Sequence, residues 1–328
     1  VGSEMCIRDR GHVIAQYHLG VCYENGFGVE QDDEKALEWY REAAQQEFPP
    51  AQCACGWFLE LGKGVEVDKQ QAKQFYRLSA EQSYAPAQCN LGFFYYHGIV
   101  VEENDTQAFN WFAKAANQGY PRAQFLLGEC YENGYGVEQD IEKAITLYRS
   151  AATNDYAPAQ SRLGLLYLRG DGIEQSDAEA FHWFSRGAEQ EEASAQCLLG
   201  ECFEFGYSVE KDFNKARELY WLSAGQGYSP AQCNLGYLYY RGIGVEENNE
   251  EAVRWFSAAA EQGNVRALFL MGACYENGFG VEKNTNKAVD CYAKAAQHSY
   301  PDAQYALGVC HELGNGVEQD TETACDCY

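Results

Sequence analysis

Basic side chains are scarce in this sequence, and they do not cluster. It contains 24 lysines and arginines against 49 aspartates and glutamates, which leaves a formal net charge of −25 at pH 7. Such a charge repels the phosphate backbone of nucleic acids. Long apolar runs are missing too, since none approaches the ~18 residues of a membrane helix. We therefore expect no nucleic-acid binding and no membrane insertion by this segment.

Recognisable catalytic and metal-binding motifs are also missing. The sequence has no CxxC, and its two CxC pairs lack a second ligand pair at zinc-site spacing. Cys310 and His311 could face the pair Cys325/Cys327 in the fold, but we expect these positions to serve packing. The six histidines accompany no serine or cysteine nucleophile in a recognisable motif. We expect no metal, no cofactor and no enzymatic activity.

What the sequence does contain is a 36-residue period. Shifting it by 36 residues aligns it with itself nine times without a gap, and the columns of Ala15, Gly20, Gly26 and Ala36 are filled in all nine copies. A fixed period of this length indicates a repeat architecture. The predicted array covers residues 11–328, with approximate repeats 12–47, 48–83, 84–119, 120–155, 156–191, 192–227, 228–263, 264–299 and a truncated 300–328.

Each copy of the repeat predicts two helices. In the first copy, apolar residues at three- to four-residue spacing predict helix A over about 12–25. Gly26 can form a left-handed C-terminal cap, and Asp32 offers an N-cap carboxylate to helix B over about 33–46. Tyr40, which is Tyr or Phe in every copy, is expected to fill the gap between repeats. One helix pair cannot bury its apolar face alone, whereas stacked neighbours can.

The repeat pattern resembles that of a known family. The best copy, residues 231–263, reads AQCNLGYLYYRGIGVEENNEEAVRWFSAAAEQG. It resembles the Sel-1-like repeat family, a relative of the tetratricopeptide repeats, and the resemblance covers roughly residues 12–328. It implies an all-α fold, a right-handed α–α superhelix (solenoid) of about nine 36-residue helix–turn–helix repeats. Val100 and Ser208 replace the second turn glycine, and only Val100 abandons turn chemistry, so the third turn departs from the family pattern.

Neither end of the sequence fits the repeat. Residues 1–10 belong to no copy, and we interpret them as a non-native scar or a disordered segment. The sequence begins with Val1 and stops at Tyr328, inside an expected helix. We therefore expect the array to be part of a longer protein whose true N-terminus is missing.

The cysteines fall mainly into two columns of helix A. Equivalent positions in adjacent repeats should lie about 10 Å apart, whereas a disulfide needs Cα atoms within about 7 Å. Cysteine-rich secreted members of the family, as the resemblance implies, pair a cysteine late in helix B with one early in the next helix A, but here that helix-B column holds alanine. We interpret most thiols as small packing residues, with reactive or disulfide roles as the alternative. This favours a reducing compartment such as the cytoplasm, while a periplasmic or secreted location stays open.

The variable positions of helix A are the candidate partner-binding residues, if helix A lines the concave face as the tetratricopeptide resemblance implies. Two columns combine carboxylates with aromatic rings, which would suit an extended segment with basic and apolar side chains. The candidates are Glu24, Trp57, Glu60, Phe93, Tyr96, Glu129, Glu132, Glu201, Glu204, Tyr237, Tyr240, Glu276 and Glu312. The same residues could instead form a solvated face with packing aromatics, and the sequence leaves both interpretations open.

The expected function is that of a protein–protein interaction scaffold or adaptor, with another protein or peptide as the partner. The resemblance implies relatives that act as adaptors in quality control of membrane and secretory proteins, in bacterial signalling and in host–pathogen contacts. Two alternatives stay open. One is a cysteine-rich secreted relative with weak β-lactamase-like hydrolase activity. The other is the solenoid portion of a larger membrane or signalling protein.

Overall fold

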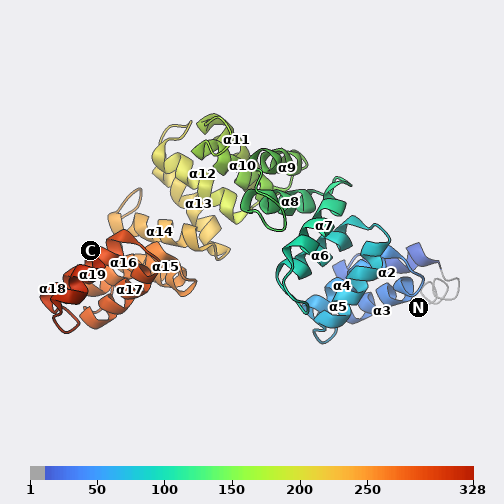
Figure 1. The fold of residues 1–328 in the computed structure, drawn as a ribbon, viewed down its shortest axis with the longest axis horizontal. Coiled ribbons are helices and arrows are strands. Elements are labelled where there is room, and N and C mark those ends of the chain that lie inside the picture. Colours follow the sequence, from blue (N-terminus) through green and yellow to red (C-terminus); the bar gives the residue numbers. More distant parts are fainter. Residues whose placement is uncertain (1–11) are drawn as a thin grey trace. The chain divides into compact units, whose positions relative to one another are not determined.

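The fold consists of helices joined in pairs. The structure, a computed structural model, describes residues 12–328, and the expected scar over residues 1–10 lies outside them. Across residues 12–328 there are eighteen α-helices and no strand (Figure 1). The chain divides into two compact units, Val1–Ala159 (unit 1) and Gln160–Tyr328 (unit 2). The all-α solenoid of nine helix pairs predicted from the period is confirmed.

The helix bounds follow the 36-residue period closely. Consecutive helices pack on one another from α2 to α9 and from α11 to α19. The helices A are α2 (Val13–Asn25), α4 (Pro49–Leu61), α6 (Ala85–Tyr96), α8 (Pro121–Asn133), α10 (Ala157–Arg169), α12 (Ala193–Phe205), α14 (Ser229–Arg241), α16 (Val265–Asn277) and α18 (Pro301–Leu313). The helices B are α3 (Asp33–Ala44), α5 (Lys69–Glu81), α7 (Asp105–Ala116), α9 (Ile141–Thr153), α11 (Asp177–Glu189), α13 (Phe213–Gly225), α15 (Asn249–Glu261), α17 (Thr285–Gln297) and α19 (Thr321–Cys327).

The predicted caps form at the turn between helix A and helix B. Gly26 is left-handed, with φ 70°, and the Asp32 carboxylate accepts a hydrogen bond from the Lys35 backbone N–H over 3.0 Å. The turn of the third repeat has the same hydrogen bond, although Val100 replaces its second glycine. Val100 adopts φ 51°, and the Ile99 N–H donates to the carbonyl of Phe94, as its counterpart does in the first turn. Hydrogen bonds around the turn therefore hold a valine in a region that normally favours glycine.

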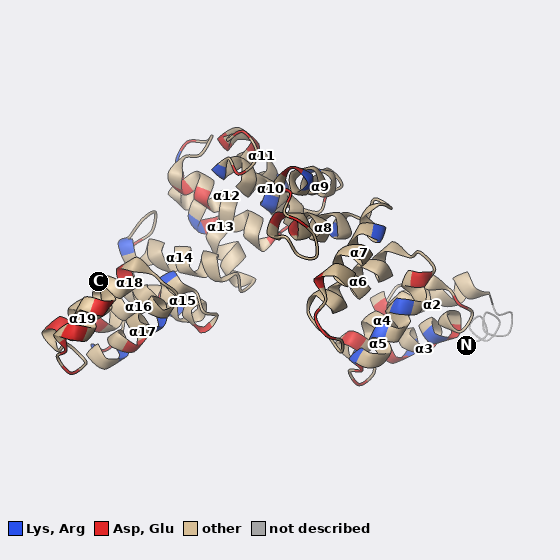
Figure 2. Ribbon diagram, viewed as in Figure 1, with Lys and Arg blue, Asp and Glu red and all other residues tan. Residues whose placement is uncertain are grey.

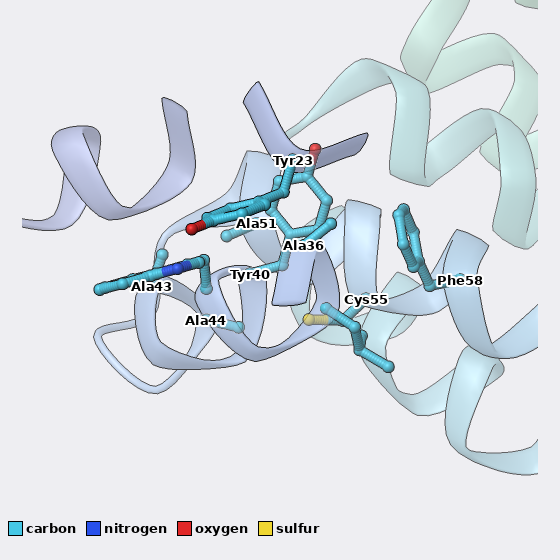
Figure 3. Close-up of a cluster of buried hydrophobic side chains, with 10 residues drawn as sticks. Tyr23, Ala36, Tyr40, Ala43, Ala44, Ala51, Cys55 and Phe58 are labelled. Atoms are coloured by element: carbon cyan, nitrogen blue, oxygen red, sulfur yellow. The ribbon is translucent and has the colours of Figure 1, made fainter. Parts of the chain in front are cut away.

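The core forms where a helix-B aromatic ring meets a helix-A glycine. A Cβ added to Gly20 would lie only 2.6 Å from the ring of Tyr40, so this glycine admits the ring. On its other side Tyr40 contacts Phe58 of the next repeat edge-on, with ring centroids 5.4 Å apart. Figure 3 shows this cluster, in which small residues such as Ala36 and Ala51 surround the rings. The Tyr40 column thus packs within its own repeat as well as between repeats.

A column of buried glutamines joins the start of helix A to the end of helix B. The amide of Gln46 donates to Gln16 over 2.6 Å, and five further pairs repeat this contact. The fourth repeat breaks the series because Asn154 stands where six other copies have glutamine. Asn154 is one methylene shorter, and the buried Gln124 Oε1 has no hydrogen-bond partner. This repeat therefore carries an unsatisfied polar group in its interior.

Candidate functional site

The carboxylates of the Glu24 column are hydrogen-bonded inside their own repeats. The hydroxyl of Tyr40 donates to Glu24 Oε2 over 2.5 Å, and the same bond is 2.6 Å long between Tyr220 and Glu204. Four further pairs share this geometry: Tyr76–Glu60, Tyr148–Glu132, Tyr292–Glu276 and Tyr328–Glu312. The glutamates expected to face a partner thus have one oxygen committed to a helix-B tyrosine.

The three exceptions in this column carry no glutamate. Where helix B supplies Phe112, Phe184 or Phe256 in place of tyrosine, helix A has Tyr96, Leu168 or Tyr240 in place of glutamate. A phenylalanine has no hydroxyl and needs no acceptor, so the loss of the glutamate leaves no buried hydroxyl without a hydrogen bond. This covariation between the two columns is visible in the sequence and indicates the contact.

The pairing with glutamate affects the pKa of the tyrosine hydroxyls. Burial first, and the adjacent carboxylate after it, raise the pKa of Tyr40 and Tyr220 far above its usual range. A buried tyrosinate beside a carboxylate would place two negative charges together. The hydroxyls therefore stay protonated donors, and the Glu24 column serves the interior of each repeat.

Unit 1 has a small pocket on its helix-A surface that brings together three of the predicted residues. Trp57, Glu60 and Phe93 line a pocket of about 110 Å³. The other residues that line it are Leu61, Asn90, Phe94 and Arg122. Glu129 and Glu132 lie further along, on α8, and are not among the described residues that line this pocket. Residues of two predicted columns, Trp57 and Phe93 from one and Glu60 from the other, thus lie together in this pocket.

Arg122 and Asn90 are the polar core of this pocket. One guanidinium nitrogen of Arg122 donates to Asn90 Oδ1 over 2.8 Å, and the guanidinium lies 5.5 Å from the centre of the Phe93 ring. The Asn90 amide in turn points to the Cys53 sulfur, 3.9 Å away. Three successive helices A supply these residues, so the arrangement depends on the stacking of repeats. Within the described residues Arg122 has no ion pair with a carboxylate, which leaves guanidinium N–H groups available.

Unit 2 repeats this arrangement 144 residues further along. Arg266 donates to Asn234 Oδ1 over 3.0 Å and lies 4.9 Å from the centre of the Tyr237 ring. The Asn234 amide is 3.8 Å from the Cys197 sulfur and donates to Glu201 Oε1 over 3.2 Å. Burial raises the pKa of Glu201, and the Asn234 hydrogen bond partly offsets that effect. The predicted residues Glu201 and Tyr237 therefore lie together here.

The asparagine and arginine positions of both units were not predicted from the sequence. A signal for them exists in the sequence, because the segment AQCNLG occurs at 87–92 and again at 231–236, and each is followed by an arginine 32 residues after its asparagine. The predicted residues Tyr96 and Tyr240 contact aromatic rings of the following repeat instead of an arginine–asparagine pair. Their rings contact Tyr135 and Phe279, with centroids 5.5 and 6.0 Å apart, so they pack along the turns.

The cysteines lie mostly in the core. Thirteen are described and all are free, nine of them buried. Burial raises the pKa of Cys53 and Cys89 to about 12, so these thiols are protonated and weakly nucleophilic at neutral pH. The positions suit the packing role that the columns predicted.

The described residues show neither the side-chain grouping of a metal site nor a helix that could span a membrane. No group of three His, Cys, Asp or Glu side chains in residues 12–328 has the arrangement of a metal site. A serine–x–x–lysine spacing occurs at Ser208–Lys211, but Ser208 lies in an exposed turn with φ 58°, in the column of the second turn glycine. No helix in the described part of the chain has the length and apolarity required to cross a bilayer. Lys and Arg are scattered through both units among more numerous acidic residues (Figure 2).

The fold and this surface define a class of protein, the α-solenoid built from stacked helix pairs. A family model described as Sel1 repeat matches nine times, at residues 13–48, 49–84, 85–120, 121–156, 157–191, 193–228, 229–264, 265–300 and 301–328. The chain belongs to the Sel1 repeat family. Sel1 repeat proteins are generally non-catalytic scaffolds, and the repeats of this chain suggest a scaffold for protein interaction.

Two solved structures show the similarity at the level of whole chains. A protective antigen of uropathogenic Escherichia coli, which displays an SLR fold, is 34% identical with a TM-score of 0.59, covering 97% of this chain and 76% of that one. A Sel1 repeat protein from Oxalobacter formigenes is 32% identical with a TM-score of 0.66, covering 74% of this chain and 96% of that one. A search of curated proteins gave no match.

Proposed function

We propose that this chain is a non-catalytic scaffold that binds an extended segment of another protein on its helix-A surface. The observation that carries the proposal is the pair Arg122–Asn90 in the pocket of unit 1. Asn90 and the Phe93 ring hold the guanidinium in place, and neither neutralises its charge. A preorganised donor group of this kind costs little entropy to use in binding.

The chemistry of the pocket fits a main chain with an apolar side chain. The guanidinium can donate to a backbone carbonyl, while the rings of Trp57 and Phe93 offer an apolar wall. Trp57 keeps 36% of its surface exposed, and the neighbouring Leu61 keeps 54%. Aromatic and arginine side chains in partly closed pockets are the usual centres of protein interfaces. We infer that the binding energy is concentrated at this pocket and at its counterpart in unit 2.

The Glu24 column has a secondary role in this proposal. Because one oxygen of each glutamate holds a helix-B tyrosine, its charge contributes to the surface potential while its position is set by the core. An acidic surface of this kind attracts partners with basic residues and speeds their encounter. Specific recognition then falls to Arg122, Asn90 and the neighbouring rings.

The test uses a random peptide library displayed on phage and selected on the immobilised full chain. Affinities of the enriched peptides are then measured by fluorescence anisotropy for the wild type and for a variant with Asn90→Ala and Arg122→Ala. We expect at least about tenfold weaker binding of the peptides that use unit 1, since the central residues of an interface contribute about 2 kcal/mol or more.

A matched control is Arg77→Ala on α5. Arg77 is also an arginine of unit 1, but its side chain is 68% exposed and lies in an ion pair with Glu81 on a helix B. The control should bind as the wild type does. Equal affinity of the Asn90/Arg122 variant and the wild type for every enriched peptide would contradict the proposed binding surface.

A further inference from the structure

The two units carry the same polar framework around different central residues. In unit 1 the framework is Arg122 and Asn90, and in unit 2 it is Arg266 and Asn234, with guanidinium–amide distances of 2.8 and 3.0 Å. An aromatic ring, Phe93 or Tyr237, supports each guanidinium. The framework is therefore a shared element, and differences in recognition must come from what surrounds it.

The main difference lies at one position of helix A. Unit 1 has Trp57 where unit 2 has Glu201, 144 residues later. Trp57 is 36% exposed, and the Lys63 ammonium lies 4.0 Å from the centre of its ring. Glu201 is half-buried, and its Oε1 accepts a hydrogen bond from Asn234. Its Oε2 has no hydrogen bond within the described part of the chain.

The substitution changes the chemistry of the site from apolar to anionic. At Glu201 the Asn234 bond fixes the carboxylate, and an ammonium or guanidinium from outside could bond to Oε2 without displacing any contact. Arg266 is nearby, yet no ion pair within 4 Å joins it to Glu201, because it bonds to Asn234 instead. The carboxylate thus has a fixed position and an unused acceptor, which is what a charge-assisted hydrogen bond requires.

We propose that each unit binds its own extended segment and that the residue at position 57 or 201 selects the side chain it takes. Trp57 selects an apolar side chain in unit 1, and Glu201 selects a lysine or arginine in unit 2. This inference rests on the proposed function and adds to it the chemistry of each segment. Two segments per chain follow, since each unit has its own framework.

The experiment isolates one site at a time in the full chain. The double substitution Asn90→Ala with Arg122→Ala removes the proposed binding site of unit 1 (silenced unit 1). Asn234→Ala with Arg266→Ala removes that of unit 2 (silenced unit 2). Both silenced chains are used to select from the random peptide phage library, after circular dichroism shows wild-type helicity. We expect the chain with unit 1 intact to enrich apolar residues at one peptide position, and the chain with unit 2 intact to enrich lysine or arginine.

Two further variants test Glu201 itself in the chain with unit 2 intact. Glu201→Gln keeps the acceptor for Asn234 and removes the charge, and we expect at least about a tenfold loss of affinity for the selected basic peptides. Glu201→Trp should shift the selection to apolar residues. Arg254→Ala is the matched control, because this arginine of unit 2 is 75% exposed on α15 and should leave binding unchanged.

The outcomes separate the two proposals. Continued enrichment of lysine or arginine by the Glu201→Gln chain would overturn the assignment of position 201 while leaving the scaffold function in place. The same preference in both silenced chains would overturn the distinction between the units. If neither the wild type nor any variant enriches a peptide, the helix-A binding function itself fails. Should Glu201→Trp not fold, the isosteric Glu201→Gln chain still decides the question.

Discussion

The hydroxyl of Tyr220 donates a 2.6 Å hydrogen bond to Oε2 of Glu204, sixteen residues earlier in the chain. Tyr220 is fully buried, and the bond joins helix B to helix A within one repeat. The fifth repeat solves the same packing problem with Leu168 and Phe184, which have no polar groups. The natural sequence thus contains both the polar and the apolar version of this contact.

This comparison predicts a rescue. Glu204→Leu alone leaves the Tyr220 hydroxyl without an acceptor and should lower the free energy of unfolding by about 1–3 kcal/mol. Adding Tyr220→Phe should restore most of that loss, because the pair then matches Leu168 and Phe184. The measurement is urea unfolding of unit 2 followed by circular dichroism in the full chain. A double variant no more stable than the single one would show that the hydrogen bond is not the cause.

The buried tyrosines also predict how stability depends on alkaline pH. Burial first, and then the carboxylate, raise the pKa of Tyr40, Tyr76 and Tyr220 in the folded chain. An unfolded tyrosine ionises near pH ~10, so above that pH the unfolded state releases protons that the folded state keeps. The stabilisation is complete below pH ~10 and declines by up to about 1.4 kcal/mol per pH unit per tyrosine above it.

Ultraviolet absorbance of tyrosinate, recorded together with circular dichroism, checks this expectation. The buried tyrosines paired with glutamate should ionise only as the helices unfold; they are Tyr40, Tyr76, Tyr148, Tyr220 and Tyr292. The Glu204→Leu/Tyr220→Phe chain has one such tyrosine fewer and should unfold at a higher pH. Ionisation of all tyrosines in the folded chain near pH ~10 would contradict the burial of these hydroxyls.

The unpaired oxygen of Gln124 predicts a stabilising substitution. Asn154→Gln introduces the residue that six other copies have, and its longer side chain can donate to Gln124 Oε1. We expect a gain of about 1 kcal/mol in the free energy of unfolding, measured with urea. The reverse change, Gln118→Asn, removes the 2.8 Å bond to Gln88 and should cost a similar amount. Equal stability of the Asn154→Gln chain and the wild type would argue against an unsatisfied group at Gln124.

The buried cysteines predict the thiol reactivity of the chain. In denaturant under non-reducing conditions, all 14 thiols should react with a colorimetric disulfide reagent. Among the cysteines of residues 12–328, the exposed Cys325 should react first in the folded chain, while Cys53 and Cys89 react slowly because burial raises their pKa to about 12. Two to four reactive thiols in denaturant, by contrast, would revive the cysteine-rich secreted alternative.

Local chemistry made the helix bounds and caps predictable from the sequence. Gly26 supplies a positive φ and Asp32 an acceptor within three residues, so neither depends on distant parts of the chain. The candidate site was predictable only in part. Trp57, Glu60 and Phe93 were identified from their columns, and whether they bind a partner stays a prediction. Arg122 and Asn90 were missed because they are 32 residues apart and meet only across two stacked repeats.

By itself the sequence determined the period, the helix pairs and the small and aromatic columns that allow stacking, since these features are local and recur in every copy. Only the tertiary structure decided what the variable columns do. It placed Glu24 against Tyr40 and Arg122 against Asn90, because helices packed side by side bring together residues that the chain keeps 16 or 32 positions apart. The glutamates expected to face a partner thus support the core as well, and a fixed arginine lies at the centre of the proposed binding surface.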